Sequence, residues 1–314
     1  MKAVTINRYG SAEVLQYQDV EKPQIKSDQM LVKVYATSVN PIDWKIRKGM
    51  LKILTGNKFP MILGFDVSGE VVEVGEKVTR FKPGDAVYAR LDNLTGGAYA
   101  EYAAVSEQVA AFKPSNMTHE QAAAVPLAAM TALQALRDQG KIKQGYKVLI
   151  NGASGGVGTF AVQIAKALEA LVTAVCGTSN VELVKTLGAD RVIDYTQQDF
   201  TKETVKYDII FDVVGNSSLS KCKNVLQPNG IYITTQPTPD KFVESFLTML
   251  SGRKAKVIVL QSSGKDLAYL KDLIEAGKIR SVIERTYPLS ETATAHVHSE
   301  KEHVVGKLVI TTVN

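Results

Sequence analysis

A glycine-rich turn between a strand and a helix constrains this chain more than any other feature of its sequence. The turn spans Asn151-Gly152-Ala153-Ser154-Gly155-Gly156-Val157-Gly158 and follows the apolar run Val148-Leu149-Ile150. Beyond the turn, apolar residues recur at i, i+3, i+4 and i+7, the spacing of one helix face: Ala161, Ile164, Ala165 and Leu168. A turn of this kind, placed between strand and helix, is where dinucleotide-binding folds hold a pyrophosphate.

The three glycine positions of the dinucleotide fingerprint fall on Ala153, Gly155 and Gly158. Gly155 would allow the backbone to approach the pyrophosphate, and Gly158 would allow the helix to pack closely on the strand. We therefore predict that residues 152–158 bind a dinucleotide: Gly152, Ala153, Ser154, Gly155, Gly156, Val157 and Gly158. The alternative is a glycine-rich connection that binds nothing, and the strand and helix on either side argue against it.

The residues after the next strand indicate which dinucleotide binds. NAD-binding folds carry Asp or Glu about 20 residues beyond the turn, where it holds the ribose 2′-hydroxyl. Here the stretch reads Thr178-Ser179-Asn180, and no carboxylate occurs between Glu169 and Glu182. Thr178, Ser179 and Asn180 would hydrogen-bond a 2′-phosphate without repelling it, which favours NADPH. The alternative is a small polar turn that also accepts NADH.

The pattern of the chain changes near residue 120. Before it, short β-branched segments separated by Gly and Pro predict an all-β, barrel-like unit. After it, strands and helices alternate, which predicts a parallel, doubly wound α/β sheet. We expect strands at 30–39, 67–74, 86–89, 147–150, 171–175, 191–193, 209–214, 231–235, around 282–283 and at 307–311, and helices at 122–136, 159–168, 181–187, 267–276 and near 291–300.

Composition excludes several classes of protein. Of the 314 residues, 45% are apolar and 22% charged, which is typical of a globular protein with a sizeable core. The net charge of +5 includes no like-charge run that would indicate nucleic acid. Two cysteines, and no apolar stretch long enough for a signal peptide or a membrane span, favour a reducing compartment. We expect a cytoplasmic protein without nucleic-acid or membrane partners.

Several further motifs carry a family resemblance over nearly the whole chain. They are Asn40-Pro41-Ile42-Asp43, Gly64-Phe65-Asp66-Val67-Ser68-Gly69-Glu70-Val71, Phe81-Lys82-Pro83-Gly84-Asp85-Ala86-Val87, Gly97-Ala98-Tyr99-Ala100-Glu101-Tyr102, Leu187-Gly188-Ala189-Asp190, Tyr287-Pro288-Leu289 and Gly306-Lys307-Leu308-Val309. With these motifs and the glycine turn, the chain resembles medium-chain dehydrogenases/reductases of the zinc-independent quinone oxidoreductase (zeta-crystallin-like) group. The resemblance implies a GroES-like substrate domain at 1–121, a Rossmann NADPH-binding domain at 122–262 and a return to the first domain at 263–314.

The residue types argue against zinc. Zinc-bearing relatives supply Cys at the position matching Asn40 and His-Glu at the positions matching Phe65-Asp66, and a single carboxylate does not hold a catalytic ion. Residues 1–121 contain no cysteine, so the four-cysteine lobe of those relatives is also missing. A site built from His296, His298 and His303 is disfavoured, because residues at i and i+2 of a helix face different ways. We predict no metal site.

Without zinc to stabilise an alkoxide, the expected hydride acceptors are already electrophilic small molecules: quinones, enals and enones. The resemblance implies that Asn40 and Asp43 lie near nicotinamide and substrate. We expect Asn40 to contact the acceptor or the cofactor, and Asp43 either to do the same or only to orient its loop. Trp44, Phe65 and Tyr99 are candidate pocket residues, and the alternative is that such aromatic residues fill the core of the β domain.

The resemblance also implies further cofactor contacts. It places Thr131 near the phosphates, Val214-Gly215 beside a ribose, Thr235 near the nicotinamide and Tyr195 by the 2′-phosphate. Many NADPH-using relatives have Lys or Arg where this chain has Ser179-Asn180, and Lys185 would compensate only partly. Two other functions stay open: an NADPH-binding, crystallin-like protein with little turnover, and a zinc-dependent alcohol dehydrogenase, against which the sequence argues. A homodimer paired through a sheet edge is expected from the family.

Overall fold

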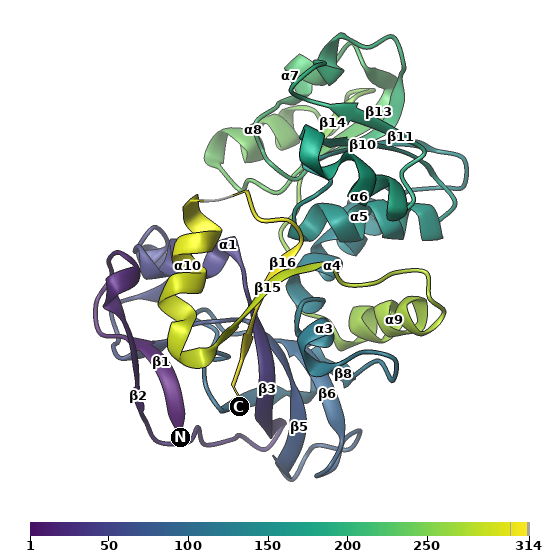
Figure 1. Ribbon diagram of the computed structural model, residues 1–314. Helices are drawn as coiled ribbons and strands as arrows, with labels where there is room; N and C mark the ends of the chain where they lie inside the picture. Colours follow the sequence, from purple (N-terminus) through teal and green to yellow (C-terminus); the bar gives the residue numbers. More distant parts are fainter. Residues whose placement is uncertain (302, 313–314) are drawn as a thin grey trace. The chain divides into compact units, whose positions relative to one another are not determined.

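The computed structural model describes residues 1–301 and 303–312 and divides into two compact units. The first unit comprises Met1–Leu127, Gln261–Glu275 and Ser281–Asn314, and the second comprises Ala128–Leu260 and Ala276–Arg280. The chain leaves the first unit along helix α4 (Pro126–Leu133). The colours of Figure 1 follow this path, with the first unit formed by the purple and blue start of the chain together with its yellow end.

The first unit is built on a seven-stranded sheet. Its path runs β15-β16-β3-β5-β6-β8, and β7 also pairs with β3. These strands are β3 (Gln29–Val39), β5 (Asp66–Val74), β6 (Ala86–Arg90), β7 (Tyr102–Ser106), β8 (Ala110–Phe112), β15 (Ile283–Pro288) and β16 (Lys307–Thr311). A smaller sheet has the order β2-β1-β4, from β1 (Lys2–Ile6), β2 (Leu15–Asp19) and β4 (Met61–Ile62). The strands predicted at 30–39, 67–74, 86–89 and 307–311 are confirmed.

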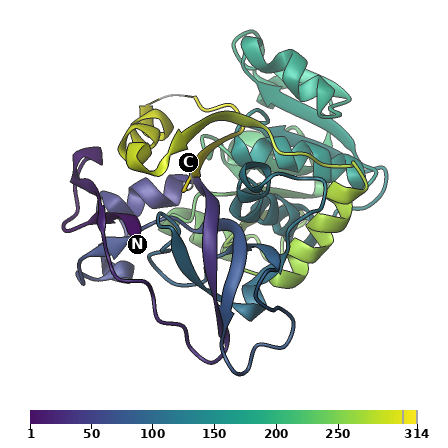
Figure 2. The same ribbon diagram turned by 60° about the horizontal axis from the view of Figure 1, so that its bottom comes forward.

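The end of the chain returns to the middle of this sheet. β16 pairs antiparallel with β3, with Leu308 opposite Val39. Figures 1 and 2 both show the yellow end of the chain beside the purple strand β3. This register brings Lys307, the first residue of β16, next to Asn40, the first residue after β3. Two residues that are 267 positions apart in the sequence thus meet at one site.

Helices cover parts of the first unit. They are α1 (Pro41–Arg47), α2 (Lys52–Thr55), α3 (His119–Ala123), α9 (Gly264–Glu275) and α10 (Thr292–Lys301). α1 starts directly after β3, where Pro41 fits the first helical position and the Asp43 carboxylate accepts the backbone N–H of Asn40. Residues 45–60 contain the end of α1 and the whole of the short helix α2.

The second unit is a doubly wound parallel sheet, as predicted. Its strand order is β11-β10-β9-β12-β13-β14, and every pair is parallel. The strands are β9 (Lys147–Asn151), β10 (Leu171–Cys176), β11 (Arg191–Asp194), β12 (Tyr207–Asp212), β13 (Leu226–Thr234) and β14 (Lys254–Val257). The direction of the strand order reverses between β9 and β12. Ligands of such sheets bind beyond the carboxyl ends of the strands at this reversal.

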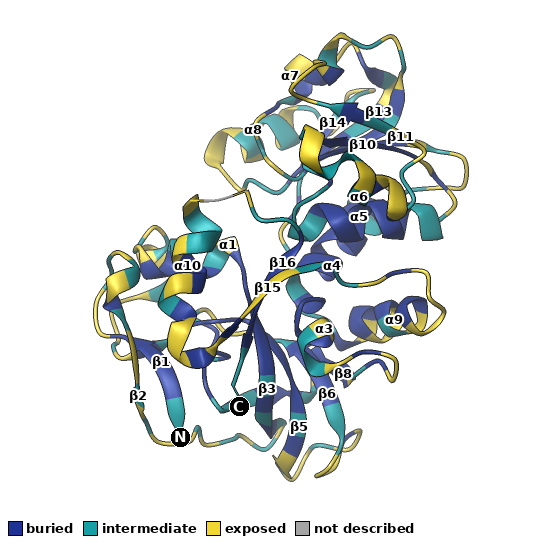
Figure 3. Ribbon diagram, in the orientation of Figure 1, coloured by how far each residue is buried: buried dark blue, intermediate teal, exposed yellow. Residues whose placement is uncertain are grey.

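Four helices connect the strands of the second unit: α5 (Gly156–Ala167), α6 (Val181–Thr186), α7 (Leu219–Cys222) and α8 (Pro239–Leu247). α5 is buried from Gly158 to Ala165, and Figure 3 draws most of it dark blue. It begins three residues before the predicted start, because Gly156 and Gly158 lie in its first turn and lack the apolar spacing of a helix. Residues 237–256 contain α8 and the start of β14.

The helix predicted at 122–136 is divided in three. α3 ends at Ala123, α4 restarts at Pro126, and a π-helical segment continues from Gln134 to Gln139. The break has a local cause, since the proline ring disfavours helical backbone at the residue before it.

Candidate functional site

The glycine turn of the second unit has a shape that only glycine permits at two of its positions. Gly152 has φ +85°, and a Cβ there would lie 2.6 Å from Val214 Cγ2. A Cβ on Gly158 would lie 2.0 Å from the carbonyl oxygen of Gly152, so this glycine allows α5 to pack against the turn. Backbone N–H groups of Gly152 and Ala153 both donate to the carbonyl of Val175, at 3.1 and 3.0 Å, and fix the turn to β10.

Gly155 leaves open space at the start of α5. It is the N-cap of this 12-residue helix, and the nearest atom to a Cβ built on it is 3.7 Å away. The first N–H groups of a helix have no partner within the helix and attract anions. Ser154, Gly156 and Val157 are half-buried beside this opening. The start of α5 therefore has room for a pyrophosphate, and binding of a dinucleotide at residues 152–158 stays a prediction.

A pair of polar residues joins the two strands at the reversal point of the sheet. Asn151 ends β9 and Asp212 ends β12, and Asn151 Nδ2 donates to Asp212 Oδ1 at 2.9 Å. The same Nδ2 donates to Asn216 Oδ1 at 2.9 Å. The sequence analysis missed both Asn151 and Asp212. The available signal was a polar residue at the end of each of two strongly apolar strands.

Asp212 also determines the shape of the turn after β12. Its carboxylate accepts the backbone N–H groups of Gly215 at 2.8 Å and Ser217 at 2.9 Å, and the Tyr232 hydroxyl at 2.7 Å. Thr235 Oγ1 donates to the carbonyl of Val213 at 2.8 Å. The predicted residues Val214, Gly215 and Thr235 are thus brought together at the carboxyl ends of β12 and β13. Thr131 lies on α4 and is almost fully buried.

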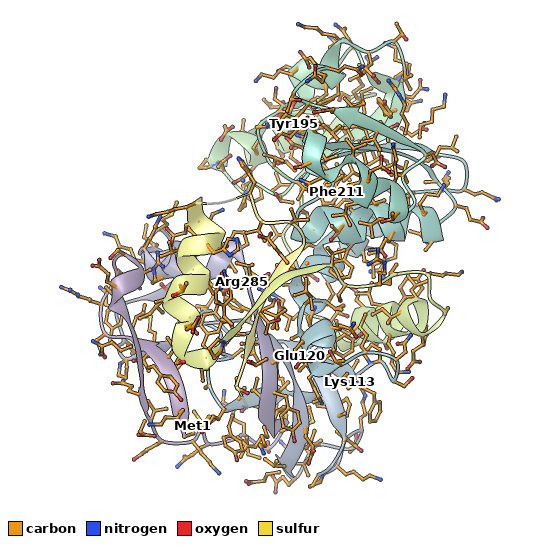
Figure 4. All side chains as sticks on the ribbon, viewed as in Figure 1. Met1, Lys113, Glu120, Tyr195, Phe211 and Arg285 are labelled. Atoms are coloured by element: carbon orange, nitrogen blue, oxygen red, sulfur yellow. The ribbon has the colours of Figure 1, made fainter. Side chains whose placement is uncertain are left out.

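The carboxyl ends of β10 and β11 form a second polar edge. Thr178 and Ser179 are exposed, and Asn180 Nδ2 donates to Ser154 Oγ at 3.4 Å. Tyr195, labelled in Figure 4, follows β11 and is 58% exposed. Its hydroxyl would lie 3.2 Å from a Cβ on Gly177. Lys185, the cation proposed to compensate for the missing Lys or Arg, forms an ion pair with Glu182 at 2.7 Å.

The first unit contains a buried polar cluster around Asn40. The Asn40 side chain is 1% exposed; its Nδ2 donates to Asp66 Oδ2 at 2.8 Å and its Oδ1 accepts from the Lys307 ammonium. Lys307 Nζ also donates to the carbonyl of Val39 at 3.0 Å and lies 3.9 Å from Asp66 Oδ2. Burial lowers the pKa of Lys307, while Asp66 and Asp43 oppose this effect. Both ends of the Asn40 amide are held by charged residues.

Asp43 lies beside this cluster with an unusual carboxyl group. Its Oδ2 accepts the Asn40 backbone N–H at 2.7 Å and the Tyr99 hydroxyl at 2.8 Å. Its Oδ1 is buried without a hydrogen-bond partner among the described residues. Burial raises the pKa of Asp43 to about 7, against the lowering effect of these hydrogen bonds. The carboxyl group is therefore poised to gain or lose a proton near neutral pH.

A histidine from α10 continues the chain of contacts from Tyr99. His296 Nε2 lies 3.1 Å from the Tyr99 hydroxyl, and its Nδ1 lies 3.4 Å from Arg47 Nη1. Since the guanidinium can only donate, Nδ1 accepts and the proton is on Nε2. Burial, with a smaller contribution from Arg47, lowers the pKa of His296 to about 3, so the ring is neutral. The Arg47 guanidinium also pairs with Glu300.

The predicted pocket residues differ in their surroundings. Phe65 and Tyr99 belong to the apolar core of the first unit, and their side chains are fully buried. In this structure they fill the core. Trp44 is half-buried, with the ammonium groups of Lys45 and Lys48 at 5.6 and 5.2 Å from its ring centroid. A role for these three residues in a substrate pocket stays a prediction.

His298 and His119 contact hydroxyl or carboxylate groups. His298 Nδ1 lies 2.7 Å from the Tyr287 hydroxyl, and its Nε2 lies 3.0 Å from Glu284. His119 Nδ1 lies 2.9 Å from Ser68 Oγ. Across residues 1–301 and 303–312, no group of three or more His, Cys, Asp or Glu side chains is arranged to hold a metal ion.

Comparison with known proteins agrees with the predicted fold class. Residues 26–115 match the family described as alcohol dehydrogenase GroES-like domain, and residues 187–310 match the family described as zinc-binding dehydrogenase. The chain is 38% identical to the chloroplast envelope quinone oxidoreductase homolog of Arabidopsis thaliana, over 99% of this chain and 98% of that protein. The chain belongs to the medium-chain dehydrogenase/reductase family. This confirms the resemblance.

Other members of the family are also similar. The NADPH-dependent alkenal/one oxidoreductase of Arabidopsis thaliana chloroplasts is 36% identical over 99% of this chain and 79% of that protein. The structure of the quinone oxidoreductase from Coxiella burnetii aligns with a TM-score of 0.92 and 35% identity, covering 100% of this chain and 99% of that one. This medium-chain dehydrogenase/reductase has, within its described residues, no helix long and apolar enough to cross a membrane.

Proposed function

We propose that this medium-chain dehydrogenase/reductase reduces quinones or α,β-unsaturated carbonyl compounds with NADPH and without zinc. The names of its relatives support the reaction: two are quinone oxidoreductases or their homologues, and one is an NADPH-dependent alkenal/one oxidoreductase. The observation that carries the proposal is the buried ammonium of Lys307 between Asn40 and Asp66. By the family resemblance, these two residues match positions where zinc-bearing relatives have Cys and Glu.

The contacts of Asp66 explain why this site disfavours a metal ion. Asp66 Oδ1 accepts the backbone N–H of Leu127 at 2.8 Å, and Oδ2 accepts Ser38 Oγ at 2.6 Å together with Asn40 Nδ2. The Lys307 ammonium lies 3.9 Å from the same Oδ2. A divalent cation at Asp66 would meet this positive charge in a buried setting, where charges interact strongly. Asp66 is therefore a partner of Lys307 and a poor metal ligand.

The remaining chemistry follows from the residues present. Bound NADPH supplies a hydride, which electrophilic quinones and enones accept without a metal to polarise them. In our proposal the second unit holds the dinucleotide through residues 152–158, Thr178, Tyr195, Val214 and Gly215, and the first unit serves the substrate side. Asn40 presents a fixed amide. Asp43, with a pKa of about 7, is a carboxyl group able to hold or release a proton at neutral pH.

Two finer expectations are kept as proposals. β14 lies at the edge of the six-stranded sheet, and we propose a homodimer paired through such an edge. We also propose a cytoplasmic location. Relatives are named for the chloroplast and for the mitochondrion, so members of the family differ in location.

The proposed reaction is tested by measuring oxidation of NADPH with a panel of acceptors, including 9,10-phenanthrenequinone and a short enal, and with NADH in parallel. We expect turnover with at least one acceptor class, and the better acceptor identifies the substrate class. A saturated ketone serves as the control acceptor, because its carbonyl carbon needs polarisation by a metal or an acid. Tight binding of NADPH with no consumption by any acceptor would instead support the crystallin-like alternative.

A further inference from the structure

The carboxyl end of β10 is the place where a doubly wound fold distinguishes the two nicotinamide dinucleotides. In such folds an acidic residue at the end of the second strand, about 20 residues past the glycine turn, accepts the ribose 2′-hydroxyl. β10 is this second strand and ends at Cys176. Thr178 follows it, exposed and without a charge. From the sequence alone, this edge lacks a carboxylate.

The structure brings a carboxylate to this edge from the neighbouring strand. Asp194, the last residue of β11, lies opposite Cys176 in the parallel pairing. Its Oδ2 accepts the Thr178 hydroxyl at 2.6 Å. Its Oδ1 accepts the backbone N–H of Thr196 at 2.9 Å and the Thr196 hydroxyl at 2.8 Å. Three hydrogen bonds therefore fix the Asp194 carboxylate, one from Thr178 and two from Thr196.

Two cations of this region, Lys185 and Arg191, form ion pairs with residues other than Asp194. The hydrogen bond from Thr178 lowers the pKa of Asp194, which stays ionised at neutral pH. Lys185 pairs with Glu182 at 2.7 Å. Arg191, at the other end of β11, pairs with Glu203. A 2′-phosphate hydrogen-bonded to Thr178 would thus lie close to a negative charge.

We propose that Asp194 is a specificity-determining residue that supplies, from the third strand, the carboxylate missing at the end of the second. Asp194 accepts the ribose 2′-hydroxyl of NADH and repels the 2′-phosphate of NADPH, so the protein uses both dinucleotides. The inference rests on the proposed binding of NADP(H) at this edge and deepens it. Asp194 lies outside the stretch of sequence between Glu169 and Glu182, in which no carboxylate follows β10.

Fluorescence titration with NADPH and with NADH tests the inference in wild type and in Asp194→Asn. Asparagine keeps one side-chain oxygen as an acceptor and removes the charge. We expect the preference for NADPH, as a ratio of dissociation constants, to rise about tenfold at low salt. The rise should be smaller at high salt, because the distance over which charges are screened falls from about 10 Å at ~0.1 M salt to about 3 Å at ~1 M. An unchanged ratio with both dinucleotides still binding would overturn the proposal.

Asp199→Asn is the matched control. It changes the net charge equally in the same unit, and asparagine can still cap the turn in which Asp199 accepts the Thr201 backbone N–H at 3.0 Å. We expect no change in the ratio; an equal rise in both variants would contradict a specific role of Asp194. A shifted ratio in Asp194→Asn without turnover of any acceptor would support this inference while rejecting the proposed reductase function.

A measurement on the wild-type protein tests the same proposal without relying on the folding of a variant. Adenosine 2′,5′-bisphosphate and 5′-AMP differ only in the 2′-phosphate, and each can be titrated against bound NADPH. Repulsion by Asp194 predicts that the 2′-phosphate contributes least to affinity at low salt and more as salt rises. A 2′-phosphate contribution that is largest at low salt and falls with salt would show net attraction and overturn the proposal.

Discussion

Asp43 and His296 are buried titratable groups joined through one tyrosine, and their pKa values move in opposite directions. Burial raises the pKa of Asp43 to about 7 and lowers that of His296 to about 3. The folded protein therefore keeps a proton on Asp43 that the unfolded chain releases above pH ~4. In the folded protein His296 also stays neutral at pH values below ~6.5, where the histidine of the unfolded chain binds a proton. The two groups give opposite pH dependences of stability.

We predict that Asp43→Asn changes the pH dependence of unfolding. Between pH ~4 and 7, the folded wild type binds one more proton at Asp43 than the unfolded chain, so this residue makes the free energy of unfolding fall as pH rises. The variant cannot titrate and lacks this fall. Its stability relative to wild type should rise by a few kcal/mol across the window, since one pKa unit corresponds to about 1.4 kcal/mol. Urea unfolding at a series of pH values measures the difference. Parallel curves would contradict the raised pKa.

Lys307 provides a second prediction at the level of single residues. Lys307→Met leaves the Asp66 carboxylate buried without its cation, and breaking a buried ion pair costs about 3–5 kcal/mol. The double variant Asp66→Asn/Lys307→Met should recover part of this loss. Lys2→Met is the control, since Lys2 pairs with Asp19 at 2.7 Å on the surface and such pairs contribute about 1 kcal/mol or less. Equal losses in Lys307→Met and Lys2→Met would contradict a buried charged pair.

At the level of elements, two glycines of one turn should have separable roles. In Gly158→Ala, the added Cβ would lie 2.0 Å from the Gly152 carbonyl oxygen, so α5 must move away from the turn. We predict a loss of about 1–3 kcal/mol of stability, typical of overpacking. In Gly155→Ala, the nearest atom is 3.7 Å away, and stability should stay within about 0.5 kcal/mol.

The same two variants should differ in binding. The methyl group of Gly155→Ala occupies the opening at the start of α5, so the dissociation constant for NADPH should rise at least about tenfold, or about 1.4 kcal/mol. Thermal unfolding and fluorescence titration measure the two effects. If Gly155→Ala binds NADPH as tightly as wild type, the dinucleotide does not lie on this turn.

Elements with a repeating local pattern were predictable from the sequence. The apolar strands 147–150 and 171–175 and the helix after the glycine turn depend on nearest neighbours along the chain, and all three are present. The start of one helix was predicted too late. α5 begins at Gly156 and not at residue 159, because the glycines in its first turn do not show the apolar spacing of a helix. α8 was missed, because six of its nine residues are exposed and none is buried, so the sequence shows no buried apolar face there.

The hydrogen bonds between distant polar residues could not be predicted from local sequence patterns. The glycine turn was found because its residues are contiguous, whereas Lys307 contacts Asn40 across 267 positions and His296 contacts Tyr99 across 197. Such pairs depend on the register of β16 with β3 and on the docking of α10. Asp194 reaches Thr178 across only 16 positions, yet the contact depends on two strands lying side by side. Candidate residues could be named from the sequence, but their partners required the fold.

At the scale of the whole molecule, each of the two units carries a different part of the proposed site. The second unit has the strand order, the reversal point and the glycine turn of a dinucleotide-binding fold. The first unit holds a buried cluster in which the Lys307 ammonium lies beside Asn40 and Asp66. We therefore propose that the cofactor supplies the hydride, and that the substrate is electrophilic enough to accept it without activation by a metal.

The most direct test of this account is turnover by metal-free protein. Protein treated with a strong chelator and shown by elemental analysis to lack zinc should oxidise NADPH with a quinone or an enal at the rate of untreated protein, and added Zn²⁺ should not increase that rate. Loss of turnover on chelation, with recovery when Zn²⁺ is returned, would contradict the account and would indicate a zinc-dependent dehydrogenase.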